Sequence, residues 1–240
     1  MTDMHQHAVM KGIINILPSV SRHAAIRHSI VFMLLGCLGA CSAITGKQTP
    51  YAIYSPSLAA TQRSTGNAVA WQLAVETPRA SDALDGNRIA VMPTPGEFQV
   101  FPAARWRDPA PKLVQGLLIQ AFEDDGRVIG VSTAAAGLHA DFTLALELRS
   151  FEIDYVDGNP HAVVQLTAKL VDYTSNRVLA VHAFAADVPV GGRGAGDAAS
   201  GIGQALNQIL PKVVAWTLAQ GNSAWARHAP DSAPQPSDIP

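Results

Sequence analysis

Apolar and polar residues alternate through the middle of the chain, as they do in β-strands that bury one face. The alternating segments are residues 142–155, 162–170 and 178–188. Within the first segment the apolar set changes phase near Arg149 and Ser150. A β-bulge with one extra residue there would return both apolar sets to the same face. Turn sequences at residues 157–160 and 173–176 separate the segments, so we expect an antiparallel meander of three strands.

Shorter apolar segments before the meander predict additional strands. These segments are residues 71–75, 88–92, 97–101, 104–107 and 128–131. Residues 97–101 and 104–107 form a single predicted strand that is interrupted at Pro102.

In two other segments the apolar residues recur with a period of 3.6 residues, which would place them on one face of a helix. These segments therefore predict helices. The first is expected to begin with Asp108 as its N-cap and to end at Gly126, and the second covers about residues 197–219. Because strands, a helix, strands and a helix follow in this order, we expect a single α+β domain. Its predicted architecture is a mainly antiparallel sheet with two helices packed on one face.

The first 40 residues have the features of an export signal. A polar, mildly basic stretch precedes an apolar run over residues 30–38, which is shorter than the roughly 20 residues that span a bilayer. The run ends in Leu38-Gly39-Ala40-Cys41, which resembles the lipobox of bacterial lipoproteins. That resemblance implies acylation of Cys41 and cleavage before it, with Cys37 as a weaker alternative. Met1 and Met10 both remain possible translation starts.

The chain after Cys41 divides by composition into three parts. We expect a membrane tether over residues 41–70, the α+β domain over 71–222 and a disordered, proline-rich tail over 223–240. In lipoproteins, Ser42 in place of Asp favours the outer membrane over the inner one. We therefore predict a lipid-anchored protein on the periplasmic face of the outer membrane.

Composition and motifs argue against several classes of function. The formal net charge of −2 provides no basic surface for nucleic acid. Hydrolase and metalloprotease motifs are missing from the sequence, and the glycine-rich residues 191–196 lack the Lys-Ser/Thr pair of a phosphate-binding loop. We therefore predict that the protein is not an enzyme and that it has no catalytic residues, no metal site and no cofactor.

Four aromatic and arginine residues are candidates for binding a protein partner, because such residues often dominate interface energies. They are Tyr51, Tyr54, Arg105 and Trp106. Trp106 has a second interpretation, since a large aromatic residue just before a helix is also typical of a core.

The order of these features resembles the PqiC-like family of ABC-type transport auxiliary lipoproteins. The resemblance rests on the lipobox, the Tyr51-x-x-Tyr54 element, residues 88–91, and Trp106 followed by Asp108-Pro109 before an amphipathic helix. It also includes residues 144–151 and 162–172. The resemblance implies a lipoprotein that docks on a mammalian-cell-entry (MCE) domain protein and works with an ABC transporter in moving lipids between membranes.

Two other classes of function remain as alternatives. One is a scaffold lipoprotein for outer-membrane assembly, and the other is a carrier that binds lipid directly. A carrier requires a continuous apolar cavity, whereas docking requires a packed core and an exposed patch.

Overall fold

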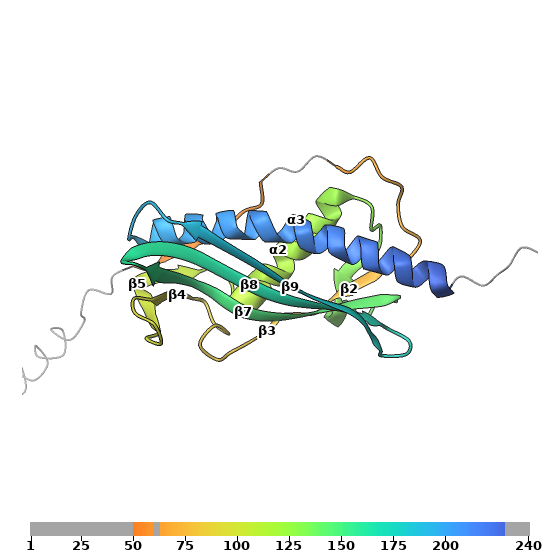
Figure 1. Cartoon of the computed structure of the whole chain (residues 1–240), viewed down its shortest axis with the longest axis horizontal. Helices are drawn as coiled ribbons and strands as arrows, with labels where there is room; N and C mark the ends of the chain where they lie inside the picture. The colour runs from red at the N-terminus through yellow and green to blue at the C-terminus, as the bar shows by residue number, and fades with distance from the viewer. Residues whose placement is uncertain (1–49, 60–62, 229–240) are drawn as a thin grey trace, which may run out of the picture. The chain divides into compact units, whose positions relative to one another are not determined.

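The computed structural model describes residues 50–59 and 63–228. The long strand β7 (Phe142–Val156) lies at the centre of its fold. Strand β8 (Asn159–Asp172) pairs with it in antiparallel fashion along its whole length, and β9 (Val178–Pro189) pairs with β8 in the same way (Figure 1). The predicted meander is therefore confirmed. The proposed signal peptide, Cys41 and the tail beyond residue 228 lie outside the described residues.

The predicted bulge in β7 is also confirmed. The register with β8 shifts between Leu148 and Ser150, so that Leu148 pairs with Leu166 and Ser150 pairs with Gln165. This shift keeps the apolar residues before and after it on one buried face.

The other edge of β7 is occupied by three short strands in succession, all parallel to it. They are β2 (Leu73–Val75), β3 (Arg79–Ala80) and β4 (Arg88–Met92). The remaining strands extend the sheet outward: β6 (Val131–Thr133) pairs with β2 in parallel, β5 (Gln99–Trp106) pairs with β4 in antiparallel fashion, and β1 (Ala52–Tyr54) pairs with β5 in parallel.

The sheet is consequently mixed, and the expectation of a mainly antiparallel sheet was wrong. Only the meander and the β4–β5 pair are antiparallel among the described strands. Parallel neighbours need a crossover connection, and the chain between β4 and β7 provides one that includes helix α2 (Ala110–Asp125).

The two predicted helices are confirmed, but their arrangement differs from the expectation of a pair on one face. Helix α3 (Ala195–His228) lies along β7, β8 and β9, whereas α2 packs against α3 and β6 (Figure 1). Asp108 does not cap α2, because Pro109 occupies the cap position and the Asp108 carboxylate accepts a hydrogen bond from Nε of Arg107 at 3.0 Å. Gly126 ends α2 with a left-handed φ of 76°, as predicted.

Strand β5 runs through Pro102 without the predicted interruption, although it is irregular there. Ala103 has a φ of 50°, and the register with β4 shifts so that Val100 pairs with Ala90 while Arg105 pairs with Arg88. The irregularity therefore sets which side chain of β5 lies opposite Arg88.

Trp71 joins the sheet to the C-terminal part of α3. Its ring is buried and meets the Phe142 ring edge-on at a centroid distance of 5.3 Å, and its indole N–H donates to Oδ1 of Asn222 at 2.9 Å. A Cβ atom on Gly221 would lie 2.5 Å from Cζ2 of Trp71. Glycine is thus needed at this position for close packing of the helix on the indole ring.

We predict that Gly221→Ala destabilises the domain by roughly 1–3 kcal/mol, the usual cost of overpacking a core. The matched control is Gly116→Ala, since Gly116 is an exposed residue of α2 where an added Cβ would meet no other atom within 4 Å. That change should stabilise the protein by about 0.5–1 kcal/mol through helix propensity. Chemical denaturation of both variants measures the two effects, and equal shifts in the same direction would refute the packing argument.

Candidate functional site

The parallel pairing of β1 with β5 brings the four predicted partner-binding residues together. Tyr54 lies level with Trp106, and Ile53 lies level with Arg105. Because side chains alternate between the two faces of a strand, Tyr54 and Trp106 point to the core. Tyr51, Ile53 and Arg105 occupy the outer face.

Trp106 belongs to the core and not to a docking surface. Its side chain is 0% exposed, and its ring packs against Phe151 at a centroid distance of 5.5 Å. Its indole N–H has no hydrogen-bond acceptor among the described residues. Tyr54 is half-buried against the same core. The core interpretation of Trp106 is therefore the correct one, and only the outer-face residues remain candidates.

On the outer face, Tyr51 lies between two arginines. The guanidinium carbon of Arg105 is 5.5 Å from the centroid of the Tyr51 ring, and that of Arg88 is 5.9 Å from it. Both distances suit a cation–π interaction. We call Tyr51, Arg88 and Arg105 the two-arginine cluster.

The two-arginine cluster brings two positive charges together, and neither is paired with a carboxylate among the described residues. Arg88 and Arg105 are direct partners across the β4–β5 ladder, where like charges disfavour pairing. The ion pairs found among the described residues include neither of them. Tyr51 and Ile53 beside them are 48% and 58% exposed, so the cluster adjoins accessible aromatic and apolar surface.

Sequence reasoning identified Tyr51 and Arg105 but missed Arg88 and Ile53. Arg88 lies in a segment that was predicted to be a strand, whereas Ile53 lies in the Tyr51-x-x-Tyr54 element of the predicted tether. Their significance depends on strand partners that are distant in sequence, and on the irregularity at Ala103 that brings Arg105 opposite Arg88. No local pattern carries that information.

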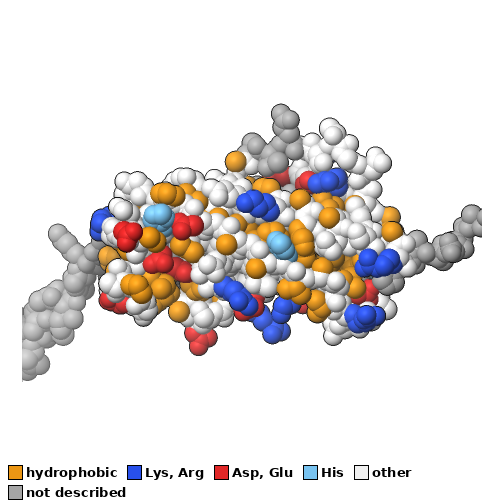
Figure 2. Space-filling view, in the orientation of Figure 1, with side chains coloured by type: hydrophobic (Ala, Val, Ile, Leu, Met, Phe, Trp, Pro, Cys, Tyr) orange, Lys and Arg blue, Asp and Glu red, His pale blue; other side chains and the backbone are white. Residues whose placement is uncertain are grey.

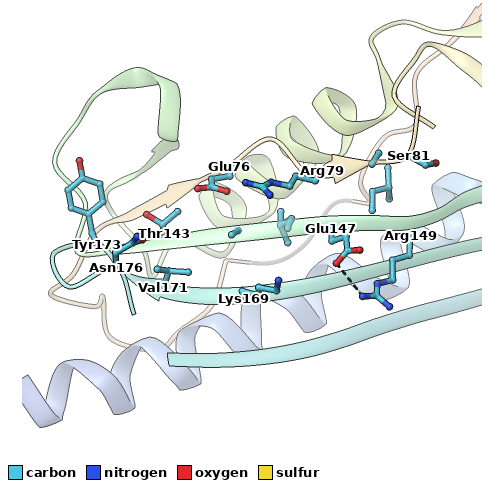
Figure 3. Close-up of a pocket in the computed structure, with 14 residues that line it drawn as sticks. Glu76, Arg79, Ser81, Thr143, Glu147, Arg149, Lys169, Val171, Tyr173 and Asn176 are labelled. Carbon is cyan, nitrogen blue, oxygen red and sulfur yellow. Dashed lines mark hydrogen bonds and ion pairs between the residues drawn. The ribbon is translucent and has the colours of Figure 1, made fainter. Parts of the chain in front are cut away.

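A polar groove lies on the outer face of β7 and β8, with a volume of about 1090 Å³ (Figure 3). Five of its fourteen lining residues are charged: Glu76, Arg79, Glu147, Arg149 and Lys169. Nη2 of Arg149 lies 3.2 Å from a carboxylate oxygen of Glu147. Because charged side chains line it, the groove is not the apolar cavity that a lipid carrier requires.

The histidines of the described domain do not form a cluster, and Figure 2 shows His side chains at separate places on one face. Nδ1 of His161 lies 2.6 Å from an Asp187 oxygen, Nε2 of His139 lies 3.7 Å from an Asp141 oxygen, and His182 packs against the Trp216 and Phe184 rings. Within residues 50–59 and 63–228, no group of three His, Cys, Asp or Glu side chains is arranged to hold a metal ion. None of the helices described there is both long and apolar enough to cross a membrane.

Glu152 is a charged residue in an enclosed position on β7. It is 8% exposed, and one of its carboxylate oxygens accepts a hydrogen bond from the Phe151 N–H at 2.5 Å. Burial raises the pKa of the Glu152 carboxyl, and the nearby Asp154 raises it further, while hydrogen bonds from Phe151 and Ser150 act in the opposite direction. The folded protein therefore binds the proton of the Glu152 carboxyl group more tightly than the unfolded chain does.

Comparisons with known proteins match this domain as a whole. The family model of the ABC-type transport auxiliary lipoprotein component matches residues 51–214. The crystal structure of protein XCC0632 from Xanthomonas campestris is similar, with 35% identity and a TM-score of 0.69 over 73% of this chain and 99% of that one. A second crystal structure, of an uncharacterized protein, shares the fold at 17% identity and a TM-score of 0.50, covering 74% of this chain and 99% of that one.

A relative from Bradyrhizobium diazoefficiens, the uncharacterized protein bll6063, is 29% identical over 147 residues. The match covers 61% of this chain but only 39% of the relative. The chain thus spans well under half of that relative's length.

We predict that Glu152→Gln stabilises the domain more at pH 7 than at pH 4. Because the folded-state pKa is raised, the wild-type protein loses stability as pH rises from the unfolded value of about 4.5 through the folded value. The amide side chain of the variant does not ionise, so the variant does not lose stability in this way as pH rises. Urea unfolding of both proteins at the two pH values measures the difference.

The control for this measurement is Glu97→Gln, for which the opposite trend with pH is expected. Hydrogen bonds from Thr94 and Gln99 lower the pKa of the exposed Glu97 carboxyl. If Glu152→Gln raises the free energy of unfolding equally at both pH values, burial does not disfavour the charged form of the Glu152 carboxyl.

Proposed function

The chain belongs to the family of ABC-type transport auxiliary lipoprotein components, and we propose that it is a tethered docking protein of a lipid transport system. In this proposal it is anchored by lipid on Cys41 to the periplasmic face of the outer membrane. Its partners are an MCE-domain protein and the ABC transporter of the same system. It acts by binding and not by catalysis.

The observation that carries the proposal is the two-arginine cluster beside Ile53, in which Tyr51 and Arg88 are exposed and Arg105 is half-buried. Arginine and aromatic residues are the types that most often contribute strongly to protein interfaces. On the inner face of β5, Trp106 is buried and packs against the buried Phe151 of β7. A solid core with an accessible patch favours docking over the enclosure of a lipid.

The proposed anchor keeps this patch near the membrane. Tyr51 lies ten positions after Cys41, and an extended chain of ten residues spans at most about 35 Å. A partner that contacts Tyr51 would therefore meet the protein close to the bilayer surface.

We predict that Cys41→Ser releases the protein from membranes and abolishes fatty-acid labelling, because the serine hydroxyl does not replace the thiol that is acylated. Fractionation of cells grown with a labelled fatty acid measures both effects. Cys37→Ser is the matched control and should behave like the wild type. Label that remains in Cys41→Ser and disappears only when Cys37 is also changed would place the anchor at Cys37.

We predict that the tagged full-length chain captures an MCE-domain protein and ABC transporter components from detergent-solubilised membranes. Tyr51→Ala should weaken this capture about thirtyfold, equivalent to about 2 kcal/mol for a true anchor residue. Tyr173→Ala is a matched control, because Tyr173 is also an exposed tyrosine, at 56%, but lies in the β8–β9 turn. Quantitative mass spectrometry measures the partners, and a wild-type chain that enriches none of them would overturn the proposed function.

A further inference from the structure

We infer that the two-arginine cluster is an anion site for the carboxylate groups of an extended acidic segment of the partner protein, which lies along β1. This inference rests on the proposed docking function and adds the chemistry of the partner to it. Three features of the described domain support it: the placement of the arginines, their unbalanced charge and the free edge of β1.

The placement gives the site its shape. Ile53, Arg105 and Arg88 lie level with one another on the adjacent strands β1, β5 and β4. Side chains of level residues point to the same face of a sheet, so these three form a row that runs inward from the sheet edge. Tyr51, two residues before Ile53, lies on the same face, and its ring contacts both guanidinium groups.

The charge determines which ligand the row favours. Two guanidinium groups that face each other across a ladder repel one another, and the Tyr51 ring compensates this only in part. A carboxylate placed between them would accept charge-assisted hydrogen bonds from the planar donor arrays of both arginines. The cluster is thus more stable with an anion bound than without one.

The free edge of β1 determines the form of the ligand. The Tyr54 carbonyl accepts a hydrogen bond from the Arg107 N–H at 2.8 Å, so Tyr54 directs its backbone groups toward β5. Because successive residues of a strand direct these groups to opposite sides, the backbone of Ile53 faces outward. An added strand can pair there, since β1 has no second neighbour among the described strands and contains neither charge nor proline.

A protein segment fits this site better than an anionic membrane surface does. The chain has a formal net charge of −2, so a plane of negative charge would be repelled by the protein as a whole. A single extended segment contacts the arginines and the β1 edge without meeting the rest of the surface.

The test is selection of peptides from a random library displayed on phage, using the full-length chain purified in detergent. We expect the selected peptides to be enriched in Asp and Glu next to strand-forming residues. The double variant R88Q/R105Q should bind these peptides at least tenfold more weakly, about the effect of losing one charge-assisted hydrogen bond. It should melt at the same temperature as the wild type or higher, because a repulsive pair is removed.

The matched control is Arg177→Gln, which removes an exposed arginine from the β8–β9 turn and should leave peptide binding unchanged. Peptides without acidic residues, or acidic peptides that bind R88Q/R105Q normally, would overturn the inference. A lipid result would also overturn it. If the wild-type chain binds phosphatidylglycerol vesicles but not phosphatidylcholine vesicles, and R88Q/R105Q loses this binding, the cluster is a site for lipid.

The same variants separate this inference from the proposed function. If R88Q/R105Q captures the MCE-domain protein as well as the wild type does, the anion site is refuted and the docking function stands. If the wild type captures no transport component, the docking function is refuted, and the peptide selection still decides the chemistry of the cluster.

Discussion

The pairing of β7 on both of its edges is the constraint on which the rest of the structure depends. One edge is joined to β8 over its full length, and the other is joined in turn to β2, β3 and β4. A strand of 15 residues could not keep its apolar side chains on one face of such a sheet without correction, because the apolar set changes phase along it. The bulge between Leu148 and Ser150 supplies that correction and allows α3 to pack over one continuous apolar surface.

The position of the candidate site follows from the same constraint. The part of β7 beyond the bulge fixes β4, β4 fixes the register of β5, and β5 fixes β1. The outer-face row of Ile53, Arg105 and Arg88 thus results from three successive pairings. Its arginines are held by backbone ladders and not by contacts with each other, so two like charges can remain adjacent at a cost that the ladders offset.

Local patterns were sufficient to predict the meander, its bulge and both helices, since each of these leaves a periodic trace in the sequence. The parallel ladders could not be predicted, because strands as short as β2 and β3 give no indication of their partner or direction. The burial of Trp106 was one of two interpretations that its sequence position allowed, and only its alignment with Tyr54 on the inner face decided between them. Arg88 was missed for the same reason: its role depends on a residue that is 17 positions away along the chain and becomes its neighbour only through an irregular ladder.

The two faces of the β1–β5 pair therefore have different physical explanations. On the inner face, burial of Trp106 against Phe151 stabilises the domain even though the indole N–H has no described acceptor, because the buried aromatic area is large. On the outer face, packing does not account for two opposed arginines beside an exposed isoleucine, and their repulsion works against folding. Residues that disfavour the folded state locally tend to be kept where a ligand compensates them. The outer face of β1 and β5 is therefore a part of the domain whose sequence packing does not explain, and the proposed docking accounts for it.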